Sequence, residues 1–349
     1  MKRLLVLTQA VDETSDVLGF FHGWLTEFSG HFDTITVVAL GVGKYDLPKN
    51  IRVFSLGKEK ISQPSFFQRI RYIVYFLGYI VRFRKGYDSV FVHMNEEYVL
   101  LGGLLWRFLG KKVSLWRNHK KGSFKTRIAV MLSHVVFHTS PDAFVSYSQR
   151  ARVMPVGIDT NLFKQKEGVA RVPHSILSLG RISPVKKVEI FIEALTLLDK
   201  EGTPFIAAVY GNCLERDKDY FQKIKIMGEK LVQKGRLSFN SGVPNNKTSE
   251  IYNTYEIYVN QTPGGSFDKT ILEAASCGTL ALSCNDALRG DVPEDLLFKE
   301  GDASGLARKI KKLFSLSDQE KENYREILQT YVEQKHSLHL LAKEIGTQI

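Results

Sequence analysis

Cysteine is scarce in this chain and forms no metal-binding pattern. The 349 residues include only three cysteines, Cys213, Cys277 and Cys284, and none are paired at C-x-x-C spacing. An odd count without that spacing argues against a disulfide framework and against a structural zinc site. We therefore expect a protein of a reducing compartment, the cytoplasm.

Long apolar runs are also missing. The longest candidates, residues 72–81 and 99–106, fall far short of the roughly 20 residues that cross a bilayer. At the N-terminus, a short apolar run ends at Thr8 and Gln9, which favours a buried strand over a secretion signal. We expect neither a transmembrane span nor export.

Several catalytic patterns are absent or incomplete. The sequence has no G-x-S-x-G and no Walker A motif, so hydrolase and kinase functions lack support. The pair Gly41 and Gly43 follows a strand-like run without the third glycine of a dinucleotide fingerprint. Asp217 and Asp219 form a D-x-D in a charged loop, which is more typical of a solvated turn than of a metal site. We therefore predict no cofactor and no metal site.

Acidic residues are few in one part of the chain. The formal net charge is +11, and residues 60–152 hold 16 lysines and arginines against 4 acidic residues. Such a surface is either simply solvated or faces an anionic partner: phospholipid, nucleic acid or a phosphorylated substrate. No recognition helix or RNA-binding motif accompanies the charge, so a non-catalytic protein that binds nucleic acid or nucleotide stays the alternative interpretation.

Residues 66–86 are aromatic, apolar and basic at both ends. The pattern predicts a helix, which either packs as an ordinary domain helix or rests on anionic lipid at the inner face of a membrane.

The strand-like runs that are present are continuous and β-branched, and helical patterns separate them. Such strands indicate parallel sheets covered on both faces, here two doubly wound α/β domains. The predicted strands are RLLVLT, ITVVAL, VFVHM and VSLWR in the first half and SILSLG, FIAAVYG, LSFNSGV, IYVNQ and LALS in the second.

Apolar periodicity lapses between the two halves, at residues 155–173, where Pro, Gly and charged residues accumulate. We predict a first domain over 1–165, a second over 171–330, and a C-terminal helix in 331–349 that packs back on the first domain.

Two loops after second-half strands suit a phosphate. In GRISPVKK, Gly180 allows a tight turn, and Arg181 and Lys186 are spaced so that both can reach one anion; a basic surface loop is the alternative. In QTPGGSFDKTILEAAS, Ser266 or Asp268 can cap a helix whose free amides and dipole favour phosphate.

Glu273 lies one turn inside that helix, where its carboxylate could bind a ribose. The alternative is an i, i+4 pair with Lys269 worth only about 0.3 kcal/mol.

Together, these elements resemble glycosyltransferase family 4, retaining enzymes with two Rossmann-like domains that face across a cleft, the glycosyltransferase B fold. VLGFFHGWLTEFS, VSLWRNHK, PVGIDTNLF and LFKEGDASGLARKI also resemble recurrent segments of that family, so the resemblance spans nearly the whole chain.

The resemblance implies site residues. Arg181, Lys186 and His119 would be catalytic: the two cations meet the donor diphosphate, and His119 lies beside the transferred sugar. Glu273 would hold the ribose as the second glutamate of E-x7-E. The other implied donor-binding residues are Gly19, Gly180, Gly265, Ser266, Phe267, Asp268, Lys269 and Thr270.

One position departs from the family. Gly265 stands where the family usually has the first glutamate, which faces the sugar; Asp268 is a candidate substitute.

The expected function is a metal-independent, retaining transfer of a hexose-type sugar from a nucleotide diphosphate sugar, with UDP or GDP as the nucleotide, to a glycan or lipid-linked hydroxyl. The expected partners are the nucleotide sugar, the acceptor and an anionic membrane surface, without specific nucleic acid.

Overall fold

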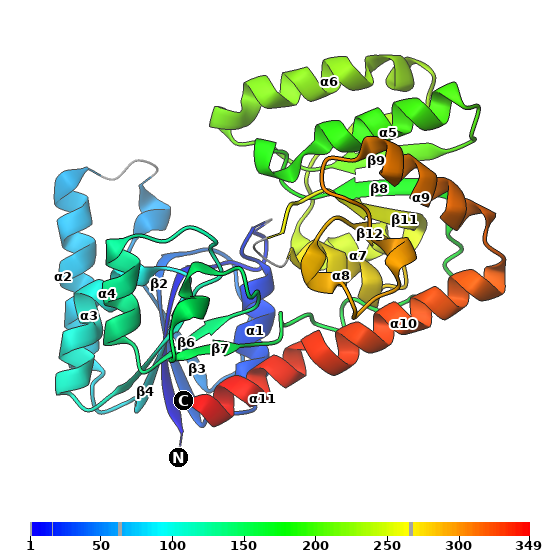
Figure 1. Ribbon diagram of the computed structural model, residues 1–349. Helices are drawn as coiled ribbons and strands as arrows, with labels where there is room; N and C mark the ends of the chain where they lie inside the picture. The colour runs from blue at the N-terminus through cyan, green and yellow to red at the C-terminus, as the bar shows by residue number, and fades with distance from the viewer. Residues whose placement is uncertain (1, 16, 62–64, 265–267) are drawn as a thin grey trace. The chain divides into compact units, whose positions relative to one another are not determined.

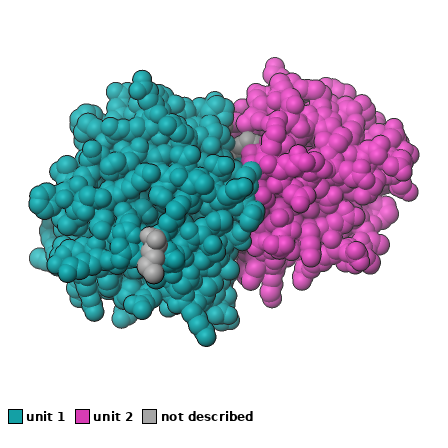
Figure 2. All heavy atoms as spheres, turned by 90° about the horizontal axis from the view of Figure 1, so that it is seen from below, with its two compact units in different colours: residues 1–157, 338–349 teal, residues 158–337 magenta. Residues whose placement is uncertain are grey.

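The computed structural model describes residues 2–15, 17–61, 65–264 and 268–349. The chain divides into two compact units (Figure 2): unit 1 holds residues 1–157 and 338–349, and unit 2 holds residues 158–337. Both are α/β units with an all-parallel sheet (Figure 1), as the sequence predicts. None of the described helices is long and apolar enough to cross a membrane.

Unit 1 has a seven-stranded sheet in the order β3-β2-β1-β4-β5-β6-β7. Its strands are β1 (Arg3–Val11), β2 (Thr34–Val42), β3 (Ile51–Ser55), β4 (Ser89–His93), β5 (Lys112–Trp116), β6 (Val135–His138) and β7 (Ala151–Val153). Its helices are α1 (Phe20–Phe28), α2 (Phe66–Arg82), α3 (Glu96–Phe108), α4 (Phe124–Leu132) and α11 (Leu338–Gln348).

Strand β1 shows why its apolar run is unbroken. Successive side chains point to opposite faces of a strand. Leu4 and Val6 pack in a core with α1 and α11, whereas Leu5 and Leu7 pack in a second core with α2, α3 and α4. Both faces of the sheet are therefore covered, which requires apolar residues at consecutive positions.

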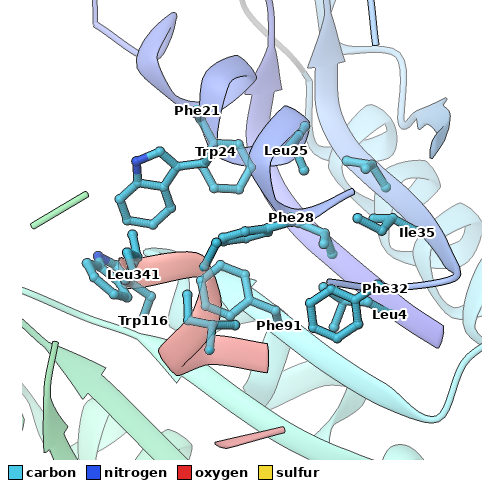
Figure 3. Packing of buried hydrophobic residues seen from close by; sticks show 14 of the residues in the cluster. Leu4, Phe21, Trp24, Leu25, Phe28, Phe32, Ile35, Phe91, Trp116 and Leu341 are labelled. Atoms are coloured by element: carbon cyan, nitrogen blue, oxygen red, sulfur yellow. The ribbon is translucent and has the colours of Figure 1, made fainter. Parts of the chain in front are cut away.

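The last helix completes the first of these cores. Leu341 of α11 is fully buried beside Trp24 and Trp116 (Figure 3). Gly157 has φ +77°, and a Cβ there would lie 2.4 Å from Leu341 Cδ2; its carbonyl accepts a hydrogen bond from Trp24 Nε1 at 3.1 Å. Only glycine suits this backbone and this space.

Unit 2 has a five-stranded sheet in the order β10-β9-β8-β11-β12. Its strands are β8 (Val172–Leu179), β9 (Ile206–Tyr210), β10 (Leu237–Asn240), β11 (Tyr255–Asn260) and β12 (Leu280–Ser283). Its helices are α5 (Val188–Lys200), α6 (Lys218–Gln233), α7 (Asn245–Thr254), α8 (Lys269–Ser276), α9 (Ala303–Ser315) and α10 (Asp318–His336).

Residues 158–165, which the sequence places in the first domain, pack within unit 2. The carbonyl of Leu162 accepts from Ser249 Oγ at 2.8 Å, and the carbonyl of Phe163 accepts from Ser276 Oγ. These bonds fix the segment to α7 and α8.

Candidate active site

The strand order of unit 2 reverses beside β8. The chain continues from β8 to β9 and β10 on one side and then returns to β11 and β12 on the other. In such sheets ligands bind beyond the carboxyl ends of the strands, at this switch point. A small hollow lies there, and its lining includes Arg181 and Lys186 after β8 and Gln261 and Thr262 after β11.

The loop after β8 presents an exposed guanidinium, that of Arg181. Gly180 has φ +148°, a region that glycine enters without strain. A Cβ on Gly211, in the loop after β9, would come within 2.0 Å of the Gly180 carbonyl oxygen, so these two loops pass very close together. Arg181 is exposed, and its side chain makes no hydrogen bond or ion pair with any residue that the structure describes. Its forked donors are therefore available for an anion in the hollow.

Lys186, by contrast, is held by a carboxylate from the second loop. Its ammonium pairs with Oδ2 of Asp268, which also accepts from Asn260 Nδ2 at 2.9 Å and Thr262 Oγ1 at 3.0 Å. Burial alone would raise the pKa of Asp268, but the charge of Lys186 and the hydrogen bonds hold that pKa well below its usual range. Asp268 is therefore ionised at neutral pH, and Lys186 joins the loops after β8 and β11.

Helix α8 begins at this junction. Asp268 caps it, and Oδ1 accepts from Thr270 N at 3.4 Å. Thr270 Oγ1 in turn accepts from Tyr258 OH at 2.7 Å. The dipole of a helix start favours negative charge, and Asp268 joins this helix start to Lys186 of the β8 loop.

Glu273 is buried on the inner side of α8, with only 3% of its surface exposed. Oε1 accepts from Asn245 Nδ2 at 3.1 Å, and Oε2 accepts from Tyr252 OH at 3.3 Å. Both partners come from α7, so α7 fixes the direction in which this carboxylate points.

Lys269, which is partly buried, interacts with the buried carboxylate of Glu273. Burial lowers the pKa of Lys269 and raises that of Glu273, while the charge of each opposes the shift of the other. The sequence offers this i, i+4 pair as the alternative to a ribose-binding role for Glu273. Burial of Glu273 strengthens the interaction between the two charges.

Two of the predicted site residues belong to unit 1. Gly19 directly precedes α1, and a Cβ there would lie 2.5 Å from the Ser15 carbonyl oxygen, so local packing already requires glycine. His119 follows β5, and its carbonyl accepts from Phe144 N at 2.9 Å. Partial burial and the charge of Arg117 lower the pKa of His119, which keeps the imidazole neutral at pH 7.

Gly265, Ser266 and Phe267 lie outside the described residues. Within the described ranges, the group of three potential metal ligands that comes together is Glu27, His31 and His339 in unit 1. Asp217 and Asp219 are not part of it.

Sequence reasoning missed four polar residues of the site: Asn245, Tyr252, Asn260 and Thr262. Asn260 and Thr262 could have been found, because they end a buried strand at the edge where ligands bind. Asn245 and Tyr252 carry no local signal, since their relation to Glu273 depends on how α7 packs against α8.

Comparison with known proteins finds similarity to glycosyltransferases. Residues 159–331 match the model of the family described as glycosyl transferases group 1. One component of the phosphatidylinositol N-acetylglucosaminyltransferase of Arabidopsis thaliana is 26% identical over 196 residues, a match that covers 52% of this chain and 41% of that protein. The chain thus spans less than half the length of this curated relative.

Solved structures match both units. HepE from Anabaena, solved in complex with UDP and glucose, has a TM-score of 0.76 at 17% identity and covers 100% of this chain and 99% of its own. Sucrose-phosphate synthase from Thermosynechococcus elongatus has a TM-score of 0.77 at 14% identity, and the match covers 99% of this chain and 98% of the synthase chain. Residues 159–331 are therefore similar to glycosyl transferases group 1, and the chain has the two-domain fold of these solved structures, the glycosyltransferase B fold.

Proposed function

We propose that the protein is a retaining, metal-independent glycosyltransferase of family 4. It moves a hexose-type sugar from a nucleotide diphosphate sugar, with UDP or GDP as the nucleotide, to a hydroxyl of a glycan or lipid-linked acceptor. The observation that carries the proposal is the junction at the switch point of unit 2, where Lys186 pairs with Asp268 at the start of α8 and Arg181 lines the adjoining hollow. The group 1 match over residues 159–331 supports it independently.

The diphosphate is the part of the donor that this region suits best. As the bond to the sugar breaks, negative charge grows on the leaving phosphate oxygens. Arg181 offers paired donors to those oxygens, and Lys186 adds a point charge. Fixed cations aimed at developing charge are usually the largest catalytic term, so no protein nucleophile is needed.

Glu273 would hold the ribose. A carboxylate with two oxygens can accept one hydrogen bond from each ribose hydroxyl, and Asn245 and Tyr252 keep those oxygens in place. Support for a nucleotide sugar also comes from HepE, which is bound to UDP and glucose, and from the N-acetylglucosaminyltransferase name of the Arabidopsis relative. A neutral His119 suits contact with sugar hydroxyls, because a neutral imidazole can donate and accept.

A thermal-shift screen with UDP, GDP, ADP and CMP, and with their sugars, tests the proposal. A ligand that binds only the folded chain stabilises it by about 2.7 kcal/mol at 100 times its Kd. We expect one nucleoside diphosphate and its sugar to raise the melting temperature. Transfer or slow hydrolysis of the same donor should follow, and a flat response to all donors would contradict the assignment.

Asp268 is proposed to position Lys186, and its substitution tests that role. Asp268→Asn removes the ion pair but keeps the size of the side chain. We expect kcat to fall by about tenfold, because the ammonium is no longer fixed near the leaving group, and KM for the donor to change little. Since the pKa of Asp268 is depressed, the carboxylate stays charged above pH 5, and the loss should be equal from pH 6 to pH 9.

The competing role for Asp268 is recognition of the sugar in place of the missing glutamate at position 265. Competition assays between two sugars on the same nucleotide separate the two roles. A change in sugar preference in Asp268→Asn would support recognition, whereas equal losses with both sugars would support positioning.

A further inference from the structure

The three helices on one side of unit 1 present a large apolar surface to solvent. Helices α2, α3 and α4 lie side by side over the same face of the sheet (Figure 1), so their solvent-facing sides form one continuous layer, which we call the outer helical face. Its exposed large apolar residues are Phe66, Phe67, Ile70, Ile73, Val74, Tyr75, Val81, Leu101, Leu104, Phe108, Phe124 and Met131.

Helix α2 shows that this surface is a second apolar side and not the edge of the core. Its buried residues are Tyr72, Phe76 and Ile80, at the i, i+4, i+8 spacing of a helix packed on a sheet. Phe67 and Val74, seven residues apart, lie on a different side and are 80% and 58% exposed. Soluble chains rarely leave such contiguous patches uncovered unless they bind something.

The ends and flanks of the outer helical face are cationic. Exposed basic residues on the three helices are Arg69, Arg71, Arg82, Arg107, Lys125 and Arg127. Among the described residues of these helices, Glu97 is the only exposed acidic one, because Glu96 is buried and pairs with Arg117 at 3.1 Å. An occupant of this face must therefore be both apolar and anionic.

We propose that the outer helical face docks on an anionic lipid bilayer. The aromatic and aliphatic side chains would enter the boundary between headgroups and acyl chains, while the guanidinium and ammonium groups would meet lipid phosphates. Nucleic acid would pair with the basic side chains of this face but would not bury its exposed Phe and Leu side chains. A second copy of the chain would bring like charges together.

This inference goes beyond the proposed function and does not depend on it, because docking needs no donor and no turnover. If both hold, an acceptor with a lipid anchor would be presented at the surface on which the enzyme rests.

The test is flotation of the full chain with vesicles of phosphatidylcholine alone or mixed with phosphatidylglycerol. We expect retention on the mixed vesicles only, and weaker retention at 1 M salt, where the screening length is about 3 Å. The double variant Phe67→Asp, Phe108→Asp changes residues that are 80% and 89% exposed. It should bind at least about tenfold more weakly, because it replaces inserted apolar groups with charges that lipid repels.

Ile226→Asp on α6 of unit 2, a position that is 71% exposed, is the matched control and should bind within about twofold of the parent, since it lies outside the face. Circular dichroism melts of all variants establish that folding is kept. Four results would overturn the proposal: equal retention on neutral vesicles, unchanged retention of the double variant, binding to nucleic acid without binding to vesicles, or self-association that the double variant abolishes without any vesicle binding.

Discussion

Arg181→Ala and Lys186→Ala are each expected to lower the rate of sugar transfer by on the order of 10²-fold or more, the usual effect of removing one group that stabilises transition-state charge. We expect this loss because of where the two side chains lie. Both residues follow β8 and reach the hollow at the switch point, where charge on a leaving diphosphate would develop. Because the effect lies in the transition state, kcat should fall more than KM rises.

Lys187→Gln provides the control for these two variants. Lys187 is the next residue in the same loop, but its ammonium pairs with Glu300 at 2.8 Å. It should stay within about twofold of the parent rate, as surface substitutions away from a site generally do. Melting temperatures close to that of the parent would show that the losses are catalytic. Near-parental turnover in Arg181→Ala would contradict the proposed site.

Glu256→Ala is expected to destabilise unit 2 by about 3–5 kcal/mol, the cost of leaving one member of a buried ion pair without its partner. Glu256 Oε1 pairs with Lys321 Nζ at 2.8 Å, and the two side chains are only 6% and 12% exposed. Oε2 accepts from His174 N at 2.6 Å. The substitution would leave both an ammonium and a backbone amide without their acceptor.

Urea denaturation followed by circular dichroism measures this loss. Glu250→Ala is the matched control, because Glu250 pairs with Lys166 at 3.5 Å on the surface, with exposures of 72% and 40%. An exposed pair of this kind is worth about 0–1 kcal/mol. Equal midpoints for the two variants would show that the Glu256 pair does not stabilise the fold. Because the chain has two units, each transition should be assigned before free energies are compared.

Local patterns predicted most of the fold. All five strands of unit 2 were expected from continuous apolar runs, and each lies where its run occurs. In unit 1, β3, β6 and β7 were missed. β3 and β7 are the two edge strands, with 5 and 3 residues, whereas β6 lies between β5 and β7 and is buried but only 4 residues long. Short edge strands with residues such as Arg52 and Arg152 lack the apolar run that marks a central strand.

Only those parts of the site that lie in a single loop between a strand and a helix could be predicted from the sequence. The loops that contain Arg181 and Asp268 were found because each comes between a strand and a helix. The pairing of Lys186 with Asp268 joins positions 82 residues apart, and Asn245 meets Glu273 across 28 residues. No sequence period encodes such contacts, because they depend on how whole elements pack.

The dependence of unit 1 on α11 has a consequence for biosynthesis. A ribosome releases residues 1–157 long before residues 338–349, yet Leu341, Ala342 and Ile345 close the same core as Trp24 and Phe28. During translation of the intervening 180 residues of unit 2, the nascent N-terminal half therefore carries an open hydrophobic groove, a state that chaperones recognise and that promotes aggregation. The core of unit 1 can therefore close only after residues 338–349 have been synthesised.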